Sequence, residues 1–185
     1  ELLGLPKAWT PSTNGVIKGK AIHIVIKSKD DFAKYKGKLA GMIVLNGEMR
    51  KVDADIEPLA TRYSEKDLEK LSMYNIPGER DDAARQERFR RTQLAREVAK
   101  FFAEEKVAAV LEGSRAPFDG GTIGVQGNGQ AYKEGEPVGV PNVVLAIEHF
   151  GRITRLLDRN VPVELELDVQ TQFTDNGGDL QAYNV

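Results

Sequence analysis

The chain has 185 residues, a formal net charge of -2 and no cysteine. This length suits a single domain with a sizeable hydrophobic core. The charge gives no electrostatic reason to expect a nucleic acid or an anionic membrane surface as a partner. The lack of cysteine excludes disulfides, thiolate zinc sites and cysteine nucleophiles. No apolar run approaches the ~20 residues that span a bilayer, so we expect no membrane span.

The N-terminal quarter predicts two strands. Residues 5–15, "LPKAWTPSTNG", are rich in turn formers and predict an irregular segment. Residues 16–27, "VIKGKAIHIVIK", alternate as a strand does, with Ile22, Ile24 and Ile26 on one face. A polar connection with one helical turn follows, and residues 42–47, "MIVLNG", predict a buried strand.

Two helices are predicted next. The first begins after Ser64, because Ser64 and Asp67 fit a capping box, and we expect Pro77 and Gly78 to end it. The second spans residues 80–106. Its first half is dense in charge and should project or fray. Its second half should pack on a sheet through an apolar stripe: Leu94, Val98, Phe101 and Phe102.

The C-terminal part alternates between strands and helix. "VAAVLEG" at 107–113 and "VPNVVLA" at 140–146 predict strands, and residues 147–160 predict a helix that ends at Asn160. The buried face of that helix is expected to hold Ile147, Phe150, Ile153 and Leu157. Residues 161–173 predict a strand with these side chains inward: Val161, Val163, Leu165, Leu167, Val169 and Phe173. Interleaved strands and helices argue for a mixed α/β domain.

Residues 113–129, "GSRAPFDGGTIGVQGNG", raise the question of a phosphate site. A P-loop needs Lys and then Ser or Thr after its last glycine, whereas Gln130 and Ala131 follow here. A dinucleotide loop needs G-x-G-x-x-G leading into a helix, whereas "GVQGNG" has the reverse spacing and leads toward a strand. The pattern favours a loop or irregular hairpin in which glycine supplies positive φ.

Catalytic and metal-binding motifs are not recognisable. His23 lies in a predicted strand and His149 in a predicted helix, and neither has a second ligand at metal spacing. "EGSRA" does not have the G-x-S-x-G pattern of a nucleophile elbow. We therefore assign no catalytic, metal or cofactor residue to this chain, and a binding or regulatory module is the better interpretation.

Three segments, in this order, resemble the protease-associated (PA) domain: "GKLAGMIVLNG" at 37–47, "FFAEEKVAAVLEG" at 101–113, and "VGVPNVVLAIEHFGRITRLLDRNVPVELEL" at 138–167. The resemblance covers roughly residues 15–173. Lys106 and Val107 depart from the family's usual Gly-Ala. Residues 48–96 are a longer insertion than the family commonly has.

The resemblance implies a swivelling β/β/α fold, a β-sandwich or open barrel with flanking helices. We expect one such domain over residues 1–185, with a helical insertion at 48–96 and a glycine-rich loop at 113–142. The flanks are similar to those in secreted zinc-dependent aminopeptidases related to glutamate carboxypeptidase. This implies a non-catalytic fragment of an exported peptidase, extracellular or periplasmic, although no signal peptide is visible. Zinc would belong to an absent catalytic domain, the expected partner in cis.

The resemblance also implies a role in covering or shaping a substrate cleft, with peptide as a possible second partner. The candidate contact residues lie in the glycine-rich loop: Arg115, Phe118, Asp119 and Tyr132. Local packing of these residues is the alternative. Other functions stay open: a PA domain of a subtilisin-like serine protease, a free-standing ligand-binding module, or a phosphocarrier-type swivelling domain that would use His23.

Overall fold

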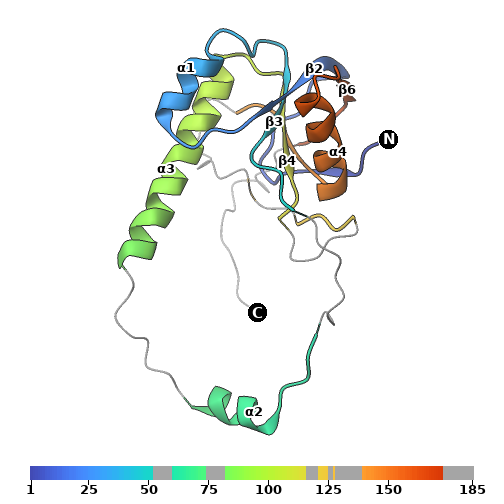
Figure 1. Ribbon diagram of the computed structural model, residues 1–185. Coiled ribbons are helices and arrows are strands. Elements are labelled where there is room, and N and C mark those ends of the chain that lie inside the picture. Colours follow the sequence, from blue (N-terminus) through green and yellow to red (C-terminus); the bar gives the residue numbers. More distant parts are fainter. Residues whose placement is uncertain (52–59, 74–81, 116–120, 125–126, 128–138, 173–185) are drawn as a thin grey trace.

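A computed structural model describes residues 1–51, 60–73, 82–115, 121–124, 127 and 139–172. Within these residues the fold is mixed α/β, as expected. A curled six-stranded sheet has the order β1-β5-β4-β3-β2-β6 and carries helices on both faces (Figure 1). A single curled sheet is closer to an open barrel than to a sandwich of two facing sheets.

The four central strands run parallel: β2 (Ile17–Ile24), β3 (Ile43–Asn46), β4 (Ala109–Gly113) and β5 (Asn142–Leu145). Strands β3, β4 and β5 are short apolar runs because helices cover both of their faces. The two edge strands are antiparallel to their neighbours: β1 (Gly4–Pro6) pairs with β5, and β6 (Glu164–Leu167) pairs with β2.

The sheet curls at strand β2, whose two halves pair with different neighbouring strands. Its residues 17–20 pair with β6, and its residues 21–24 pair with β3 on the opposite side. At Gly19 a Cβ atom would lie 2.9 Å from the carbonyl oxygen of Gly41, closer than real Cβ atoms approach a backbone atom. Only glycine therefore fits this position without moving the loop before β3.

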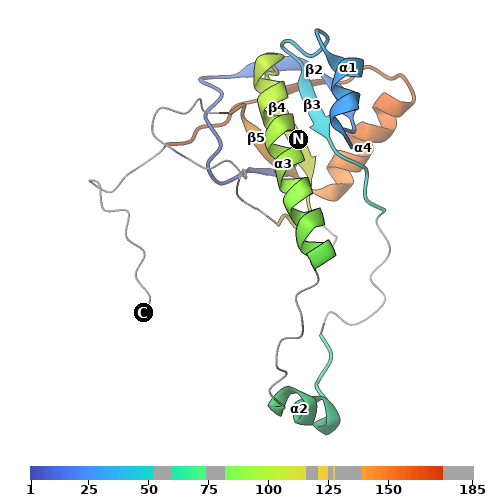
Figure 2. The same ribbon diagram turned by 90° about the vertical axis from the view of Figure 1, so that its left-hand side faces the viewer.

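Two hydrophobic layers flank the sheet (Figures 1 and 2). On one face α4 (Ile147–Asp158) buries Ile147, Phe150 and Ile153 against β3, β4 and β5. On the other face lie α3 (Asp82–Glu104) and α1 (Phe32–Tyr35), which follows a 3-10 turn, η1 (Lys29–Asp31). There Val98, Phe101 and Phe102 pack on the sheet. Both buried faces predicted from helical periodicity are confirmed, with Leu94 and Leu157 partly buried.

The predicted insertion contains α2 (Glu65–Ser72) and the exposed first half of α3. Helix α2 begins at the predicted capping box: the Asp67 N–H donates to Ser64 Oγ (3.3 Å), and the Ser64 N–H donates to Asp67 Oδ2 (3.1 Å). It has no buried residue and lies apart from the sheet in both views (Figures 1 and 2). It ends at Ser72, where Met73 turns extended, earlier than the predicted end at Pro77 and Gly78, which lie outside the described residues.

Two predictions from the sequence are wrong. Leu5 and Pro6, in the segment predicted to be irregular, belong to strand β1, which pairs with β5. Val161, predicted to point inward, is 43% exposed, because it belongs to the turn that ends α4 and its N–H donates to the Leu156 carbonyl (3.0 Å). The alternation predicted for the last strand holds from Val163 to Val169. Phe173 lies outside the described residues.

Candidate functional site

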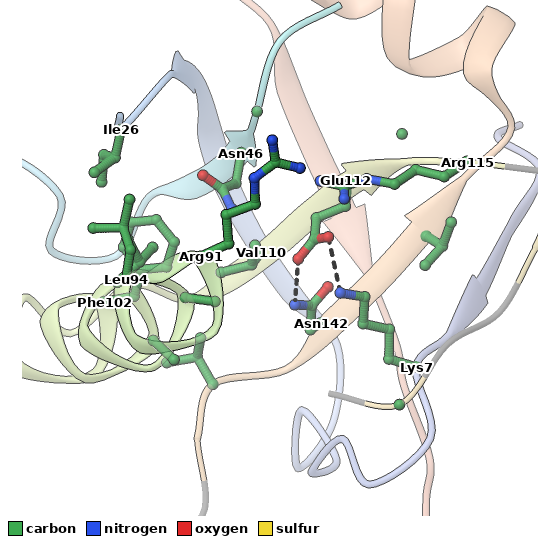
Figure 3. A pocket seen from close by; sticks show the side chains of 18 of the residues that line it. Lys7, Ile26, Asn46, Arg91, Leu94, Phe102, Val110, Glu112, Arg115 and Asn142 are labelled. Atoms are coloured by element: carbon green, nitrogen blue, oxygen red, sulfur yellow. Dashed lines mark hydrogen bonds and ion pairs between the residues drawn. The ribbon is translucent and has the colours of Figure 1, made fainter. Parts of the chain in front are cut away.

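A cavity of about 380 Å³ lies between α3 and the sheet (Figure 3). This volume is within the range of about 300–1,000 Å³ that ligand pockets usually have. Its walls come from the N-terminal segment, the ends of β3 and β4, the start of β5, and one side of α3. Segments far apart in the sequence therefore build a single site.

One side of the cavity is apolar. Helix α3 contributes Leu94, Val98 and Phe102, and the sheet contributes Val110 and Val144. The α3 residues recur at a spacing of four, so they lie on one side of the helix and face the sheet. The apolar stripe through which α3 packs on the core therefore also forms one wall of the cavity.

The floor of the cavity is polar. Glu112, on β4, accepts a hydrogen bond from Asn142 Nδ2 at 2.9 Å and forms an ion pair with Lys7 Nζ at 2.8 Å (Figure 3). The Lys7 and Glu112 side chains are only 13% and 21% exposed. A carboxylate held by one ammonium group and one amide is locally neutralised, which explains how Glu112 is accommodated in a strand covered on both faces.

The N-terminal segment is fixed where it supplies Lys7. The Lys7 N–H donates to the Asn142 carbonyl (3.0 Å), and the Asn142 N–H donates to the hydroxyl of buried Thr10 (2.7 Å). The first of these bonds continues the pairing of β1 with β5 past Pro6. Lys7 is therefore held at the floor of the cavity by backbone contacts as well as by its ion pair.

Two arginine side chains reach the cavity from opposite sides. Arg91 comes from α3 and Arg115 from the segment after β4, and Figure 3 shows their guanidinium groups pointing toward one another. Arg91 Nε also forms an ion pair with Glu87 (2.8 Å). Hydrogen bonds from Arg90 and Arg91 lower the pKa of Glu87 to about 2. Arg115 is exposed and makes no hydrogen bond or ion pair with the described residues.

Of the four contact residues predicted from the sequence, Arg115 lies at this cavity. Phe118, Asp119 and Tyr132 lie outside the described residues. The described parts of the glycine-rich loop contact the body of the domain: the Gly124 N–H donates to Ser114 Oγ (3.1 Å), and the Gly121 N–H donates to Glu148 Oε1 (3.0 Å). Gly124 and Gly127 also line the cavity.

The sequence analysis missed Lys7, Arg91, Glu112 and Asn142. A signal for two of them is visible in the sequence. Glu112 and Asn142 are polar residues within the apolar runs "VAAVLEG" and "VPNVVLA". A polar side chain in a strand covered on both faces needs a partner, and here each is the partner of the other.

The two histidines have structural contacts. His23 Nε2 donates to the Gly47 carbonyl (2.9 Å), its Nδ1 lies 3.4 Å from Asp158, and its ring meets Phe150 edge to face. Its side chain is only 16% exposed. His149 Nδ1 accepts a hydrogen bond from the Leu3 N–H (2.7 Å). These contacts hold His23 in place between β3 and α4 and do not favour a phosphocarrier role for it.

A second hollow, of about 660 Å³, lies on the opposite face of the sheet, near β1 and β6. Its base is apolar and includes Leu111, Val143 and Leu165, and the carboxylates of β6 line it as well. One of these, Glu166, is neutralised by Lys18 Nζ at 2.8 Å. The cavity at α3 is the stronger candidate, because cationic groups converge there beside an apolar wall.

No described helix is both long and apolar enough to cross a membrane. Within the described ranges, no three His, Asp or Glu side chains gather closely enough to hold a metal ion.

No family model matches the chain, and no curated protein matches it. Among solved structures, the fold is similar to part of the crystal structure of a Peptidase M28 precursor from Shewanella amazonensis SB2B, with a TM-score of 0.50 and 13% sequence identity. The match covers 90% of this chain and 30% of that chain. The likeness is one of fold.

Proposed function

We propose that this chain is a non-catalytic protease-associated domain of a zinc metallopeptidase of the aminopeptidase or carboxypeptidase class. Its role would be to cover or shape the substrate cleft and to make protein or peptide contacts. The observation that supports this most is the fold shared with less than a third of a Peptidase M28 precursor. A segment of this size leaves room in such a protein for a separate catalytic domain.

The finer fold assignment, a swivelling β/β/α domain of the PA type, belongs to the same proposal. It is supported by the curled sheet with antiparallel edge strands and by the helices on its two faces. It is supported further by the order of the three segments that resemble the family. In this proposal residues 48–96 are an insertion, and α2 is its described helix.

The proposal places zinc and its ligands in a catalytic domain joined to this chain in cis. The parent protein would be exported and would act outside the cell or in the periplasm. The surface of this chain that meets the cleft would include the glycine-rich loop with its exposed residue Arg115. Exposed loop residues on a rigid sheet are well placed for such contacts.

The direct experiment assays the isolated chain with aminoacyl and dipeptide substrates in the presence of zinc. We expect no turnover, because the proposal places the catalytic groups elsewhere. Turnover that a chelator abolishes would contradict a non-catalytic role. Circular dichroism must show a folded chain, so that inactivity is not caused by unfolding.

Reading the coding sequence downstream of Val185 separates the alternatives. An H-x-D motif after a strand, followed by paired acidic residues, is expected for the zinc peptidase. A serine protease domain in that place would favour the subtilisin-like alternative. A stop codon directly after Val185 would favour a free-standing module and would contradict the proposed cis arrangement.

A further inference from the structure

The cavity at α3 has more positive than negative charge available to a ligand. Lys7, Arg91 and Arg115 line it, with Glu112 as the acidic residue among the described lining. The ion pair between Lys7 and Glu112 cancels one charge of each sign. Arg91 shares the single carboxylate of Glu87 with Arg90, so positive charge remains in excess there. The guanidinium groups of Arg91 and Arg115 point toward one another (Figure 3). These like charges repel each other, and an anion that binds between them would be attracted by both guanidinium groups.

The nature of the anion follows from the wall beside the arginines. Leu94 and Ile26, whose side chains are only partly buried, line the cavity beside the charged groups. A free inorganic anion would leave this apolar surface exposed to water. A ligand that carries a carboxylate next to an apolar group would use both parts, because removing apolar surface from water favours binding.

We propose that this cavity binds the terminal carboxylate of an apolar amino acid or of a peptide that ends in one. In such a residue the carboxylate and the apolar side chain share one Cα atom, so both lie within the reach of a cavity of this size. Arg115 and Arg91 hold the carboxylate, because the guanidinium group matches a carboxylate in a two-bond geometry. The apolar side chain lies against Leu94 and Ile26.

Glu112 does not prevent the ligand carboxylate from binding. An unneutralised carboxylate on the floor would repel the ligand, but Lys7 and Asn142 hold this one at 2.8 and 2.9 Å. The arginines therefore decide where the ligand carboxylate lies. Binding uses residues of this chain alone, so it does not depend on whether the chain is associated with a peptidase.

Calorimetric titration of the chain with four probes tests the ligand class: N-acetyl-L-leucine, its uncharged amide, acetate and inorganic phosphate. We expect N-acetyl-L-leucine to bind at least tenfold more tightly than each of the other three. Phosphate or acetate binding as tightly would overturn the apolar part of the proposal. Equal binding of the amide would overturn the carboxylate part, and no binding by N-acetyl-L-leucine would overturn the site.

Variants test the residues. Arg115→Gln and Arg91→Gln should each weaken binding about tenfold or more, the scale of a lost charge-assisted contact. Arg115→Lys should retain part of the affinity. Arg90→Gln is the matched control, because Arg90 also pairs with Glu87 yet does not line the cavity. If Arg90→Gln weakens binding as much as Arg91→Gln does, the site is wrongly placed. In NMR spectra, ligand-induced shifts should include the amides of Arg91 and Arg115.

Discussion

Lys106 and Asn160 occupy the same position after two different helices. Each follows the last turn, of α3 and α4 respectively, and each adopts the left-handed conformation, with φ of 57° and 60°. In both turns the N–H of the next residue donates to the carbonyl five residues before it: Val107 to Phe102, and Val161 to Leu156. These are Schellman turns, in which the left-handed position favours glycine.

Lys106→Gly is expected to stabilise the fold by about 0.5–1 kcal/mol. A side chain in the left-handed region costs about 1–2 kcal/mol, and the greater freedom of glycine in the unfolded chain offsets part of the gain. Lys106 is exposed, so the change removes no buried contact. Urea unfolding measures the difference.

Asn160→Gly is the matched control for that experiment. Asparagine tolerates the left-handed conformation better than lysine does, so the gain should be smaller. A loss of stability in Lys106→Gly, or an equal gain in both variants, would contradict this account.

Phe102→Ala and Phe89→Ala should separate the two halves of α3. Phe102 is 2% exposed and packs in the core, so its removal should cost about 3–5 kcal/mol. Phe89 is 65% exposed on the same helix, so its removal should stay within about 0.5 kcal/mol. Thermal or urea unfolding measures both. A cost above about 1 kcal/mol for Phe89→Ala would show that the first half of α3 is also packed.

Much of the fold could be predicted because most helices and strands can be recognised from their local sequence pattern. The strands β3, β4 and β5 are apolar runs, and the buried faces of α3 and α4 follow from helical spacing. Strand β1 could not be predicted in this way. It has three residues, including a glycine and a proline, and it exists because β5, more than a hundred residues away, offers it an edge.

Among the charged residues of the candidate site, only Arg115 was predicted from the sequence. The other charged residues lie on different elements: Lys7 before the first turn, Arg91 on α3, and Glu112 on β4. No spacing in the sequence connects them, because the order of the strands in the sheet decides which of them meet. A polar residue in a doubly covered strand, such as Glu112, predicts that a partner exists without saying which one.

Lys7→Met should destabilise the fold by about 1–2 kcal/mol. The change removes the cation from Glu112, a largely buried carboxylate, and leaves that charge uncompensated. A double-mutant cycle also needs the single variant Glu112→Gln and the variant that carries both changes. The double variant should be more stable than the sum of the two single losses indicates, by about 1 kcal/mol. Strict additivity in urea unfolding would show that the two side chains do not interact.

Asp31 gives the fold a pH dependence. Its carboxylate accepts hydrogen bonds from Lys34 Nζ (2.6 Å) and from the N–H groups of Lys27 (2.9 Å) and Ser28 (3.1 Å). These bonds lower its pKa from 3.8 to about 2. The folded state therefore binds the proton less readily than the unfolded state does. The resulting stabilisation is complete above the unfolded value, and it is lost as the pH falls from about 3.8 to about 2.

Asp31→Asn should therefore lower stability at neutral pH, and its difference from the unmodified chain should shrink through that interval and vanish below it. Urea unfolding at a series of pH values measures the difference. An NMR titration of the Asp31 carboxyl carbon should give a midpoint near 2. Asp30→Asn is the control, because the neighbouring carboxylate makes none of these hydrogen bonds, and it should keep the original pH profile. A constant difference at every pH would mean that Asp31 acts through its shape and not through its charge.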